Sequence, residues 1–395
     1  MSSSTNNTNA QKCKADVECK ADVVVIGFGF AGAHAVSTLV DAGRSVVVVE
    51  PTGNHQFLTR LAAVAAGTQP LTDRAVPISS MFDVRVVRER AVSAGEGSVA
   101  LESGRIIAAE YVLLTAGAEP IEPPIEGLEH SMPLRSAQDA AAIRQRLDEV
   151  DRVAIVGGGP TGCQLAGAIR TARPDMAVSL VDGSERLMSN FDARLGLHTR
   201  QVLEQRGVEV ILSDEAASIA IDGVTLESGR KLDGAVMWTA GFQPTMEAFG
   251  PTNQGQLVVD RLGRVASSSK IFAAGDAAAH LDESGDPHAM SAQIAAQAGK
   301  QVGQNLDALL RGEPARPLDL KDRGWVVDLS GGVGVAEIMG VTLAKPGLDR
   351  VVPFMHDAID LRNLWQLGGI DFVRRFRPGV IESDLTAPRV SSTRA

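Results

Sequence analysis

The chain has 395 residues, 44% of them hydrophobic and 22% charged, which is enough for two or three soluble domains with their own cores. Its formal net charge of -10 argues against a nucleic-acid partner, because phosphate binding requires a basic face. The 3 cysteines form no C-x-x-C pair and show no metal-ligand spacing. We therefore expect neither a dithiol relay nor a metal site, and a reduced, cytoplasmic protein.

Residues 1–20 are almost all polar and predict a disordered tail. No apolar signal-peptide core precedes the first strand. No stretch reaches the roughly 18 consecutive apolar residues of a transmembrane helix. We expect no membrane-spanning segment.

The first predicted elements form a βαβ unit. A β-branched run at residues 22–26 predicts a buried parallel strand, residues 31–41 an Ala-rich helix, and residues 45–49 a second strand. The turn between the first strand and the helix reads Gly27-Phe28-Gly29-Phe30-Ala31-Gly32. This G-x-G-x-x-G loop follows a strand and opens a helix, which is the context that predicts a dinucleotide site.

The glycines of this loop have separate expected roles. Gly27 permits the tight turn, Gly29 lets a pyrophosphate approach the backbone, and Gly32 allows the helix to pack close to the strand. The helix N-terminus offers unpaired N–H groups to the phosphates. Glu50 ends the second strand, where an acid binds the ribose hydroxyls.

The same pattern returns in the middle of the chain. Residues 153–156 predict a strand, residues 163–170 a helix, and residues 178–181 another strand. The loop between the first two reads Gly157-Gly158-Gly159-Pro160-Thr161-Gly162. Asp182 closes the second strand and favours the free 2′-hydroxyl of NADH over the 2′-phosphate of NADPH, although Arg186 nearby softens that preference.

Each predicted unit also ends in a similar segment. Residues 114–120 read Leu-Thr-Ala-Gly-Ala-Glu-Pro, and residues 238–244 read Trp-Thr-Ala-Gly-Phe-Gln-Pro. Later, Gly275-Asp276 follows an apolar strand, an arrangement that is the usual second contact for FAD. That strand belongs with the first unit, which the chain re-enters after the second. The first unit is therefore predicted to take FAD and the second NADH.

These elements predict an α/β fold with two Rossmann-type dinucleotide-binding domains, the second inserted in the first, plus a C-terminal α+β region. We expect an FAD-binding domain at 21–147 and 250–316, an NAD(H)-binding domain at 148–249, and a dimer or membrane-association region at 317–395.

A long helix predicted over residues 289–310 carries Gln293 and Gln297 one turn apart on one face. An amide both donates and accepts, which suits a quinone in both redox states. Glutamine on a solvated helix face is the other interpretation, and the residues alone favour it slightly. For Cys163, and for His280 and His288, packing and loop roles are favoured over chemistry.

Residues 351–377 have apolar side chains near helical spacing, flanked by arginines. A helix in a membrane interface fits this pattern. A helix docked on the core or on a second copy of the chain fits it equally well. The apolar positions are Ala358, Leu361, Leu364, Trp365 and Phe372.

Together these motifs resemble the FAD-dependent pyridine nucleotide oxidoreductases and, more narrowly, the type II NADH dehydrogenases, the NADH:quinone oxidoreductases. The resemblance runs from about residue 21 to about residue 370. Three stretches carry it beyond the general motifs: residues 55–67, residues 134–140, and the A-Q-x-A-x-Q motif at 292–297.

The resemblance implies that NADH gives hydride to N5 of FAD and that the reduced flavin passes two electrons to a quinone or other two-electron acceptor. It implies a homodimer, and a cytoplasmic protein that lies peripherally on the inner face of a membrane. The expected catalytic residues are Gln293, Gln297 and Gln164. The expected cofactor-binding residues are Gly27, Gly29, Ala31, Gly32, Glu50, Arg60, Val92, Ala116, Gly117, Asp276, Gly157, Gly159, Thr161, Gly162, Asp182, Ala240 and Gly241.

The chain departs from the family pattern at two places. Gln164 stands where the family has a glutamate, which keeps the shape but loses the charge. Residues 58–61 read Leu-Thr-Arg-Leu in place of Pro-Leu-Leu-Tyr. Three other functions stay open: reduction of a small iron–sulfur protein, reduction of a soluble small molecule, and non-enzymatic NADH sensing like that of apoptosis-inducing-factor-like proteins.

Overall fold

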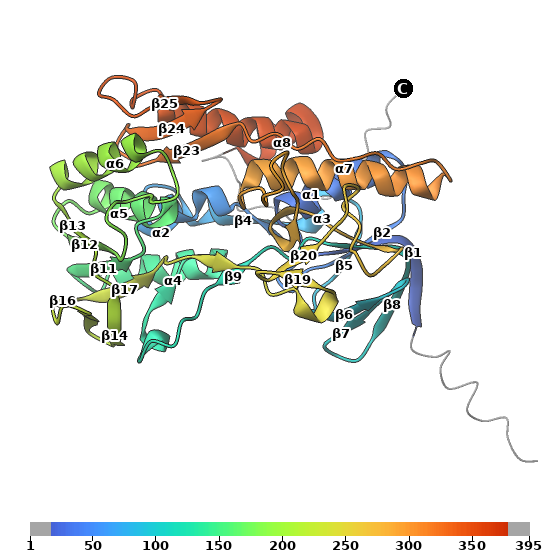
Figure 1. Cartoon of the computed structure of the whole chain (residues 1–395), viewed down its shortest axis with the longest axis horizontal. Coiled ribbons are helices and arrows are strands. Elements are labelled where there is room, and N and C mark those ends of the chain that lie inside the picture. The colour runs from blue at the N-terminus through green and yellow to red at the C-terminus, as the bar shows by residue number, and fades with distance from the viewer. Residues whose placement is uncertain (1–16, 378–395) are drawn as a thin grey trace, which may run out of the picture.

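The computed structural model describes residues 17–377, and it has the α/β architecture expected from the sequence, built on two mainly parallel sheets (Figure 1). Most of the predicted tail, residues 1–16, lies outside the described residues. Strand β1 (Val17–Ile26) nevertheless begins within the predicted tail. Among residues 17–377, no helix combines the length and the hydropathy needed to cross a membrane.

The first sheet has seven strands and contains the predicted first βαβ unit. Strand β1 lies at its centre, with parallel β2 on one side and parallel β8 on the other, and helix α1 follows it directly. Strand β21 returns to pair with β8. The chain therefore re-enters the first sheet after building the second. The bounds are β2 (Val46–Val49), β5 (Arg85–Val87), β6 (Ala91–Gly95), β7 (Ser98–Leu101), β8 (Ile106–Leu114), β21 (Ile271–Ala273) and α1 (Phe30–Asp41).

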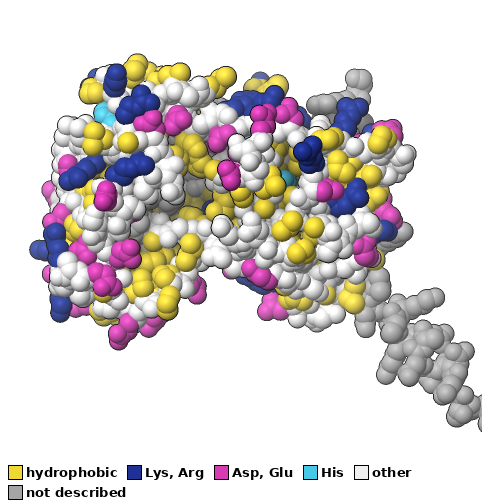
Figure 2. Space-filling view, viewed as in Figure 1, with side chains coloured by type: hydrophobic (Ala, Val, Ile, Leu, Met, Phe, Trp, Pro, Cys, Tyr) yellow, Lys and Arg dark blue, Asp and Glu magenta, His cyan; other side chains and the backbone are white. Residues whose placement is uncertain are grey.

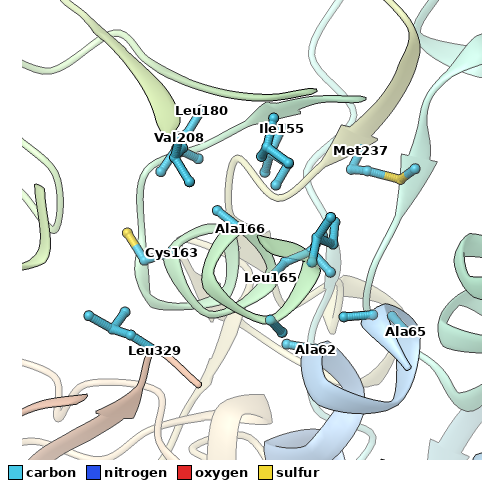
Figure 3. Close-up of a cluster of buried hydrophobic side chains, with 14 of the residues drawn as sticks. Ala62, Ala65, Ile155, Cys163, Leu165, Ala166, Leu180, Val208, Met237 and Leu329 are labelled. Carbon is cyan, nitrogen blue, oxygen red and sulfur yellow. The ribbon is translucent and has the colours of Figure 1, made fainter. Parts of the chain in front are cut away.

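The second sheet has five parallel strands in the order β10-β17-β11-β12-β13. Helix α5 lies under it, between the sheet and helix α2 (Figure 3). An antiparallel sheet of β14, β15 and β16 lies beside it. The bounds are β10 (Met132–Pro133), β11 (Arg152–Val156), β12 (Ala177–Asp182), β13 (Val208–Leu212), β14 (Ala216–Ala220), β15 (Gly223–Leu226), β16 (Lys231–Asp233), β17 (Ala235–Trp238), α2 (Leu61–Ala66), α5 (Pro160–Ala172) and α6 (Ala193–Gln205).

Two short strands connect the two units where the chain passes between them. Strand β9 (Glu119–Pro120) pairs in antiparallel fashion with β18 (Phe242–Gln243). Strand β10 pairs with β17, and helix α4 (Ala137–Leu147) lies in the same hydrophobic core as the second sheet. Residues 132–147 therefore pack with the second sheet, although they lie before the predicted boundary at residue 148.

The C-terminal part packs against both units. Helix α7 (Ala292–Leu310) lies along α1 (Figure 1), and a Cβ atom at Gly299 would fall only 2.0 Å from the carbonyl oxygen of Ala31. The last sheet is antiparallel, and helix α8 (Val352–Phe376) has non-helical backbone at Gly368 and Gly369. The remaining bounds are β3 (Asn54–Gln56), β4 (Ala75–Pro77), α3 (Ile78–Met81), β19 (Thr252–Asn253), β20 (Gln256–Val258), β22 (Ala278–Ala279), β23 (Gly324–Asp328), β24 (Gly334–Ile338) and β25 (Val341–Leu343).

Candidate functional site

The first glycine loop connects β1 to α1 and is held tightly by its own neighbours. Gly27 has a φ of +87°, and its N–H donates to the carbonyl oxygen of Val49 over 2.9 Å. A Cβ atom at Gly27 would lie 2.6 Å from the carbonyl oxygen of Thr115, and one at Gly32 would lie 2.4 Å from the carbonyl oxygen of Gly27. The protein's own packing therefore requires glycine at both positions.

Gly29 and Gly159 are the second glycines of the two loops, and the protein's own packing does not explain them. Gly29 has an ordinary φ of -74° and Gly159 one of -73°. A Cβ atom at either position would meet nothing within 4 Å. Each residue also begins a helix without a side-chain cap, which leaves N–H groups open at that end. Both sites fit a phosphate group that comes close to the backbone.

The second loop connects β11 to α5 and repeats the first. Gly157 has a φ of +113°, and its N–H donates to the carbonyl oxygen of Val181 over 2.8 Å. A Cβ atom at Gly162 would lie 1.9 Å from the carbonyl oxygen of Gly157. Thr161 lies beside Gly162 in the first turn of α5. The two loops thus use the same glycine positions for the same contacts.

One carboxylate stands at the mouth of each loop. Glu50, directly after β2, accepts from the N–H of Phe28 through Oε2 over 3.3 Å. Asp182, the last residue of β12, accepts from the N–H of Gly158 through Oδ2 over 2.5 Å, and its Oδ1 accepts from the N–H of Ser184 over 2.8 Å. Both acids therefore lie where the ribose next to a bound pyrophosphate is expected.

Two threonines complete the loops, and we assigned them no role from the sequence. The Thr115 hydroxyl donates to the carbonyl oxygens of Ile26, at 3.0 Å, and Gly27, at 2.9 Å. The Thr239 hydroxyl does the same for Val156 and Gly157, at 3.0 Å each. The repeated Thr-Ala-Gly of the two closing segments was the signal that could have revealed them.

The alanine and glycine that follow each threonine also lie against the loops. The Cβ position of Gly27 comes within 2.7 Å of Cα of Ala116, and that of Gly157 within 2.6 Å of N of Ala240. Gly117 has a φ of +78° and Gly241 one of +110°, where the chain turns away. These four predicted residues therefore lie close to the nucleotide loops.

Asp276 lies beside the first loop, although it is far from that loop in the sequence. Gly275 before it packs against α1, because a Cβ atom there would lie 2.9 Å from Cβ of Ala31. Burial raises the pKa of the Asp276 carboxyl, and Arg135, whose Nη2 lies 3.3 Å from Oδ2, acts in the opposite direction. Arg135 also donates from Nε to the carbonyl oxygen of Ala118 over 3.1 Å. Arg135 lies in residues 134–140, one of the stretches that carry the family resemblance, but we assigned it no role from the sequence.

Arg60 and Val92, two further predicted cofactor-binding residues, belong to neither glycine loop. Arg60 is buried, its Nε donates to Oδ2 of Asp360 over 2.8 Å, and its guanidinium lies 4.2 Å from the ring centroid of Phe57. Val92 is 44% exposed on β6, which is at the end of the first sheet. Arg60 therefore holds α8 in place, and Val92 faces solvent.

The amides of Gln293 and Gln297 share one face of α7, as expected, but both are occupied. Gln293 donates from Nε2 to Asp322 Oδ1 and to the carbonyl oxygen of Gly324, over 2.8 and 2.7 Å. Gln297 donates to the carbonyl oxygen of Lys321 over 3.0 Å. Neither glutamine is simply a solvated helix residue, and neither amide points freely into a cavity.

Gln164 and Cys163 lie in the first turns of α5. Gln164 is half-buried, and its amide has no hydrogen bond to another residue of the described part. Cys163 is buried in the core (Figure 3), and its thiol donates to the carbonyl oxygen of Gly158 over 3.3 Å. Burial raises the pKa of this thiol well above its ordinary range. The packing role expected for Cys163 is confirmed.

His280 and His288 line the same small cavity as Asp276. Burial lowers the pKa of His280 to about 4, so the imidazole is neutral at pH 7. The backbone N–H of His288 donates to the carbonyl oxygen of His280 over 2.8 Å and closes the loop between them. Both lie near the first loop, in the loop positions favoured from the sequence. Within residues 17–377, no cluster of His, Cys, Asp and Glu side chains is placed to hold a metal ion.

The surface is hollowed between the two nucleotide units, and hydrophobic side chains line the hollow (Figure 2). Over the rest of this face, acidic and basic side chains are mixed, and they form no large basic patch. A hollow between two nucleotide-binding units suits a hydride transfer, because that reaction requires the two bound nucleotides to lie next to each other.

Comparison with known proteins agrees with this arrangement. Residues 21–299 match the family described as pyridine nucleotide-disulphide oxidoreductase. A type II NADH:quinone oxidoreductase of Staphylococcus aureus is 25% identical over 390 residues, covering 88% of this chain and 96% of that protein. This relative confirms the resemblance drawn from the motifs.

Solved structures of two kinds share the fold. NDH2 from Plasmodium falciparum in complex with NADH has a TM-score of 0.77 at 14% identity, covering 91% of this chain and 99% of that chain. The ferredoxin reductase for the CYP199A2 system of Rhodopseudomonas palustris has a TM-score of 0.69 at 21% identity, covering 80% and 88%.

Proposed function

Because the chain belongs to the pyridine nucleotide-disulphide oxidoreductase family, which matches residues 21–299, we propose that it is an FAD-dependent NADH dehydrogenase with a quinone acceptor. The first unit holds FAD and the second unit holds NADH. The flavin supplies the capacity to accept a hydride and to release two electrons. The residues of the chain bind and orient the two nucleotides and exclude water between them.

The FAD site is supported by the Gly29 position, by Glu50 and by Asp276. Gly29 leaves the N-terminus of α1 open to a pyrophosphate, and Glu50 lies at the end of β2 to bind ribose hydroxyls. Asp276 is held by Arg135 beside the same loop. Ala31, Gly32, Ala116 and Gly117 shape the floor of this site.

The NADH site is supported by Gly159, Asp182 and the surroundings of Arg186. The open space at Gly159 admits a pyrophosphate. Asp182 accepts ribose hydroxyls and repels a 2′-phosphate. Arg186 does not neutralise this preference, since its Nη1 donates to the carbonyl oxygens of Met188 and Phe191 over 3.3 and 2.8 Å. NADH is therefore the preferred donor.

A quinone acceptor is supported by the length of the match to the relative named type II NADH:quinone oxidoreductase. The match covers 88% of this chain and 96% of that protein. A match of this length extends beyond residues 21–299, which the family model covers, into the C-terminal part. Cys163 is not suited to disulfide chemistry, because its thiol is buried and donates to the carbonyl oxygen of Gly158.

Apolar side chains exposed on α8 support a quinone acceptor that resides in a membrane. Phe354 is 75% exposed, Trp365 61% and Ile370 56%, while Leu364 and Phe372 on the other side pack into the core. We propose that this side contacts a membrane surface, in the manner of an interfacial helix. The test is flotation with anionic vesicles: the wild type floats, and a Phe354→Ser/Trp365→Ser variant stays in the soluble fraction. Dimerisation of the wild type through these residues, without flotation, would assign the surface to a second copy.

The proposed function is tested by steady-state turnover of the purified yellow protein. NADH oxidation is followed at saturating NADH with a short-chain ubiquinone, with ferricyanide, and with a ferredoxin as separate acceptors. The quinone is expected to support turnover with a KM in the micromolar range. Turnover that depends on the ferredoxin and ignores the quinone would replace this proposal with an iron–sulfur protein reductase.

A further inference from the structure

Helix α7 carries four amide side chains at four-residue intervals, Gln293, Gln297, Gln301 and Asn305, which we name the amide ladder. Residues 316–324 run back along the helix in extended form, and we name them the strap. Each ladder residue is hydrogen-bonded to the strap. Only the first two belong to the motif found in the sequence.

The pairing follows a repeated geometry. Gln297 accepts from the N–H of Lys321 over 3.1 Å and donates to its carbonyl oxygen over 3.0 Å. Gln301 does the same with Asp319, over 2.7 and 2.8 Å. One amide thus satisfies both backbone groups of one strap residue, as a residue in a neighbouring β-strand would.

The two ends of the ladder keep this pattern with small changes. Asn305 accepts from the N–H of Arg316 and donates to its carbonyl oxygen, over 2.8 Å in each case. Gln293 accepts from the N–H of Arg323 over 3.2 Å and donates to the carbonyl oxygen of Gly324 over 2.7 Å. All four amides therefore use their donor and acceptor groups on the strap.

The spacing explains why the pattern repeats. Four residues of α-helix rise about 6 Å. Two residues of extended chain rise about 6.6 Å. Gln293, Gln297 and Gln301 therefore meet alternate strap residues, Arg323, Lys321 and Asp319. Asn305 reaches Arg316, which is three residues before Asp319 in the strap. The strap side chains between the paired residues, Leu318 and Leu320, pack against the core of the first unit.

The upper end of the ladder lies beside the FAD site. Gln293 is in the first turn of α7, and Ala295 in the same turn lies against Gly275, where a Cβ atom would be 3.2 Å from Cβ of Ala295. Asp322 and Gly324, the strap residues bound by Gln293, therefore lie against the first turn of α7, at the level of Gly275 along the helix. They also line a cavity of about 470 Å³ between the second unit and β23–β25.

We infer that the amide ladder positions the strap for the acceptor step, and that Gln293 and Gln297 act through the strap and not by direct contact with the acceptor. Gln301 and Asn305 are then positioning residues that hold the same strap, although they lie outside the A-Q-x-A-x-Q motif. This inference rests on the proposed function for its acceptor step. The hydride step from NADH takes place in the hollow between the units and does not depend on the ladder.

The test uses the FAD-loaded full chain with Gln301→Ala, Gln301→Glu and Asn305→Ala. Gln201→Ala, at an exposed position of α6, is the matched control. Tryptic cleavage after Lys321 and Arg323 measures how firmly the strap is held. Anaerobic stopped-flow measures flavin reduction by NADH, and steady-state turnover gives KM and kcat for the quinone and for ferricyanide.

We expect cleavage to become about tenfold faster in the three ladder variants. Gln301→Ala and Asn305→Ala each remove both hydrogen bonds to their strap residue, and Gln301→Glu removes one and places a carboxylate against the Asp319 carbonyl oxygen. The quinone KM is expected to rise about fivefold or more, while flavin reduction and ferricyanide turnover stay at the wild-type rate. Gln301→Glu is expected to behave like Gln301→Ala, because an ionised carboxylate cannot donate to the Asp319 carbonyl oxygen.

Three results would overturn the inference. Wild-type protection of the strap in all ladder variants would show that the amides do not hold it. An equal loss in flavin reduction and quinone turnover would make the ladder a general stabiliser. Wild-type behaviour of Gln301→Glu would assign the effect to side-chain packing. A wild-type enzyme without quinone turnover would refute the proposed function, and the cleavage rates would still decide whether the ladder holds the strap.

Discussion

Arg60 and Asp360 form a buried ion pair between the first unit and the C-terminal helix, with 2.8 Å between Nε and Oδ2 and side-chain exposures of 1% and 7%. Thr59 adds a hydroxyl hydrogen bond to Oδ1 of Asp360 over 3.0 Å. Nearby, His34 and Asn363 are hydrogen-bonded over 2.6 Å. Polar contacts as well as apolar ones therefore hold α8 on the first unit.

Removing one partner of this pair is expected to destabilise the protein strongly. Asp360→Ala leaves the Arg60 guanidinium buried without its carboxylate, at a cost of about 3–5 kcal/mol in the free energy of unfolding. The double variant Arg60→Met/Asp360→Leu is expected to regain most of this loss, because no uncompensated charge remains. Urea unfolding of the FAD-loaded protein measures both. If the double variant were as stable as the wild type but bound FAD more weakly, Arg60 would be a residue of the cofactor site.

A substitution at Gly29 can test FAD binding separately from folding, because the space at its Cβ position is open. Gly29→Ala adds a methyl group that meets no protein atom within 4 Å, so the free energy of unfolding without cofactor is expected to change by less than about 1 kcal/mol. FAD affinity is expected to fall at least about tenfold, because the methyl occupies the space for the pyrophosphate.

Gly32→Ala is the matched control in the same loop. Its Cβ atom would lie 2.4 Å from the Gly27 carbonyl oxygen, so folding itself is expected to suffer. Fluorescence titration with FAD and urea unfolding separate the two effects. Unchanged FAD affinity in Gly29→Ala would refute the placement of the pyrophosphate.

Asp182 is expected to set the choice of nicotinamide donor. Asp182→Ala removes the acceptor for ribose hydroxyls and the repulsion of a 2′-phosphate, so the KM for NADH is expected to rise about tenfold while NADPH use improves. The ratio of kcat/KM for the two donors measures this. Glu50→Ala is the control in the other loop and is expected to leave that ratio at its wild-type value. An unchanged ratio in Asp182→Ala would remove the reason for preferring NADH.

Two buried histidines predict a loss of stability in mild acid. Burial lowers the pKa of His55 to about 4, with the hydrogen bond to the Phe28 carbonyl oxygen opposing it, and burial lowers that of His280 to about 4 as well. The unfolded chain, with histidine pKa values near 6.5, therefore takes up protons first as the pH falls. Stability is complete above about pH 6.5 and decreases toward pH 4, by up to about 3 kcal/mol per histidine.

Urea unfolding at pH 7.0 and pH 5.0 measures this loss. The variant His55→Phe is expected to show a smaller difference between the two pH values than the wild type, whatever its stability at pH 7.0. The same difference in both proteins would show that His55 does not titrate on unfolding.

The nucleotide loops were predictable from sequence because their chemistry is local. Gly27 and Gly157 require positive φ, and Gly32 and Gly162 touch the backbone of their own loops, so the residue type and the spacing alone reveal them. The Gly275-Asp276 motif after an apolar strand identified Asp276, which lies far away in sequence.

The partners of Arg60 and Gln293 were not predictable in the same way. Arg60 meets Asp360 across about 300 residues, and no periodicity marks that pair. Gln293 pairs with the backbone of the strap, and a backbone partner leaves no trace in residue type. The motif therefore located Gln293 and Gln297 correctly on one helix face, while their actual contacts depend on the tertiary path of residues 316–324.

The central claim is that electrons pass from NADH through FAD to a quinone, and anaerobic double-mixing stopped-flow tests it most directly. The enzyme is first reduced with one equivalent of NADH and then mixed with a short-chain ubiquinone, with oxygenated buffer, or with a ferredoxin. We expect loss of the oxidised flavin absorbance on the first mixing and its return fastest with the quinone, by about 100-fold or more over oxygen, which corresponds to about 2.7 kcal/mol in activation free energy. Flavin that NADH does not reduce, or reduced flavin that the quinone reoxidises no faster than oxygen does, would contradict the account.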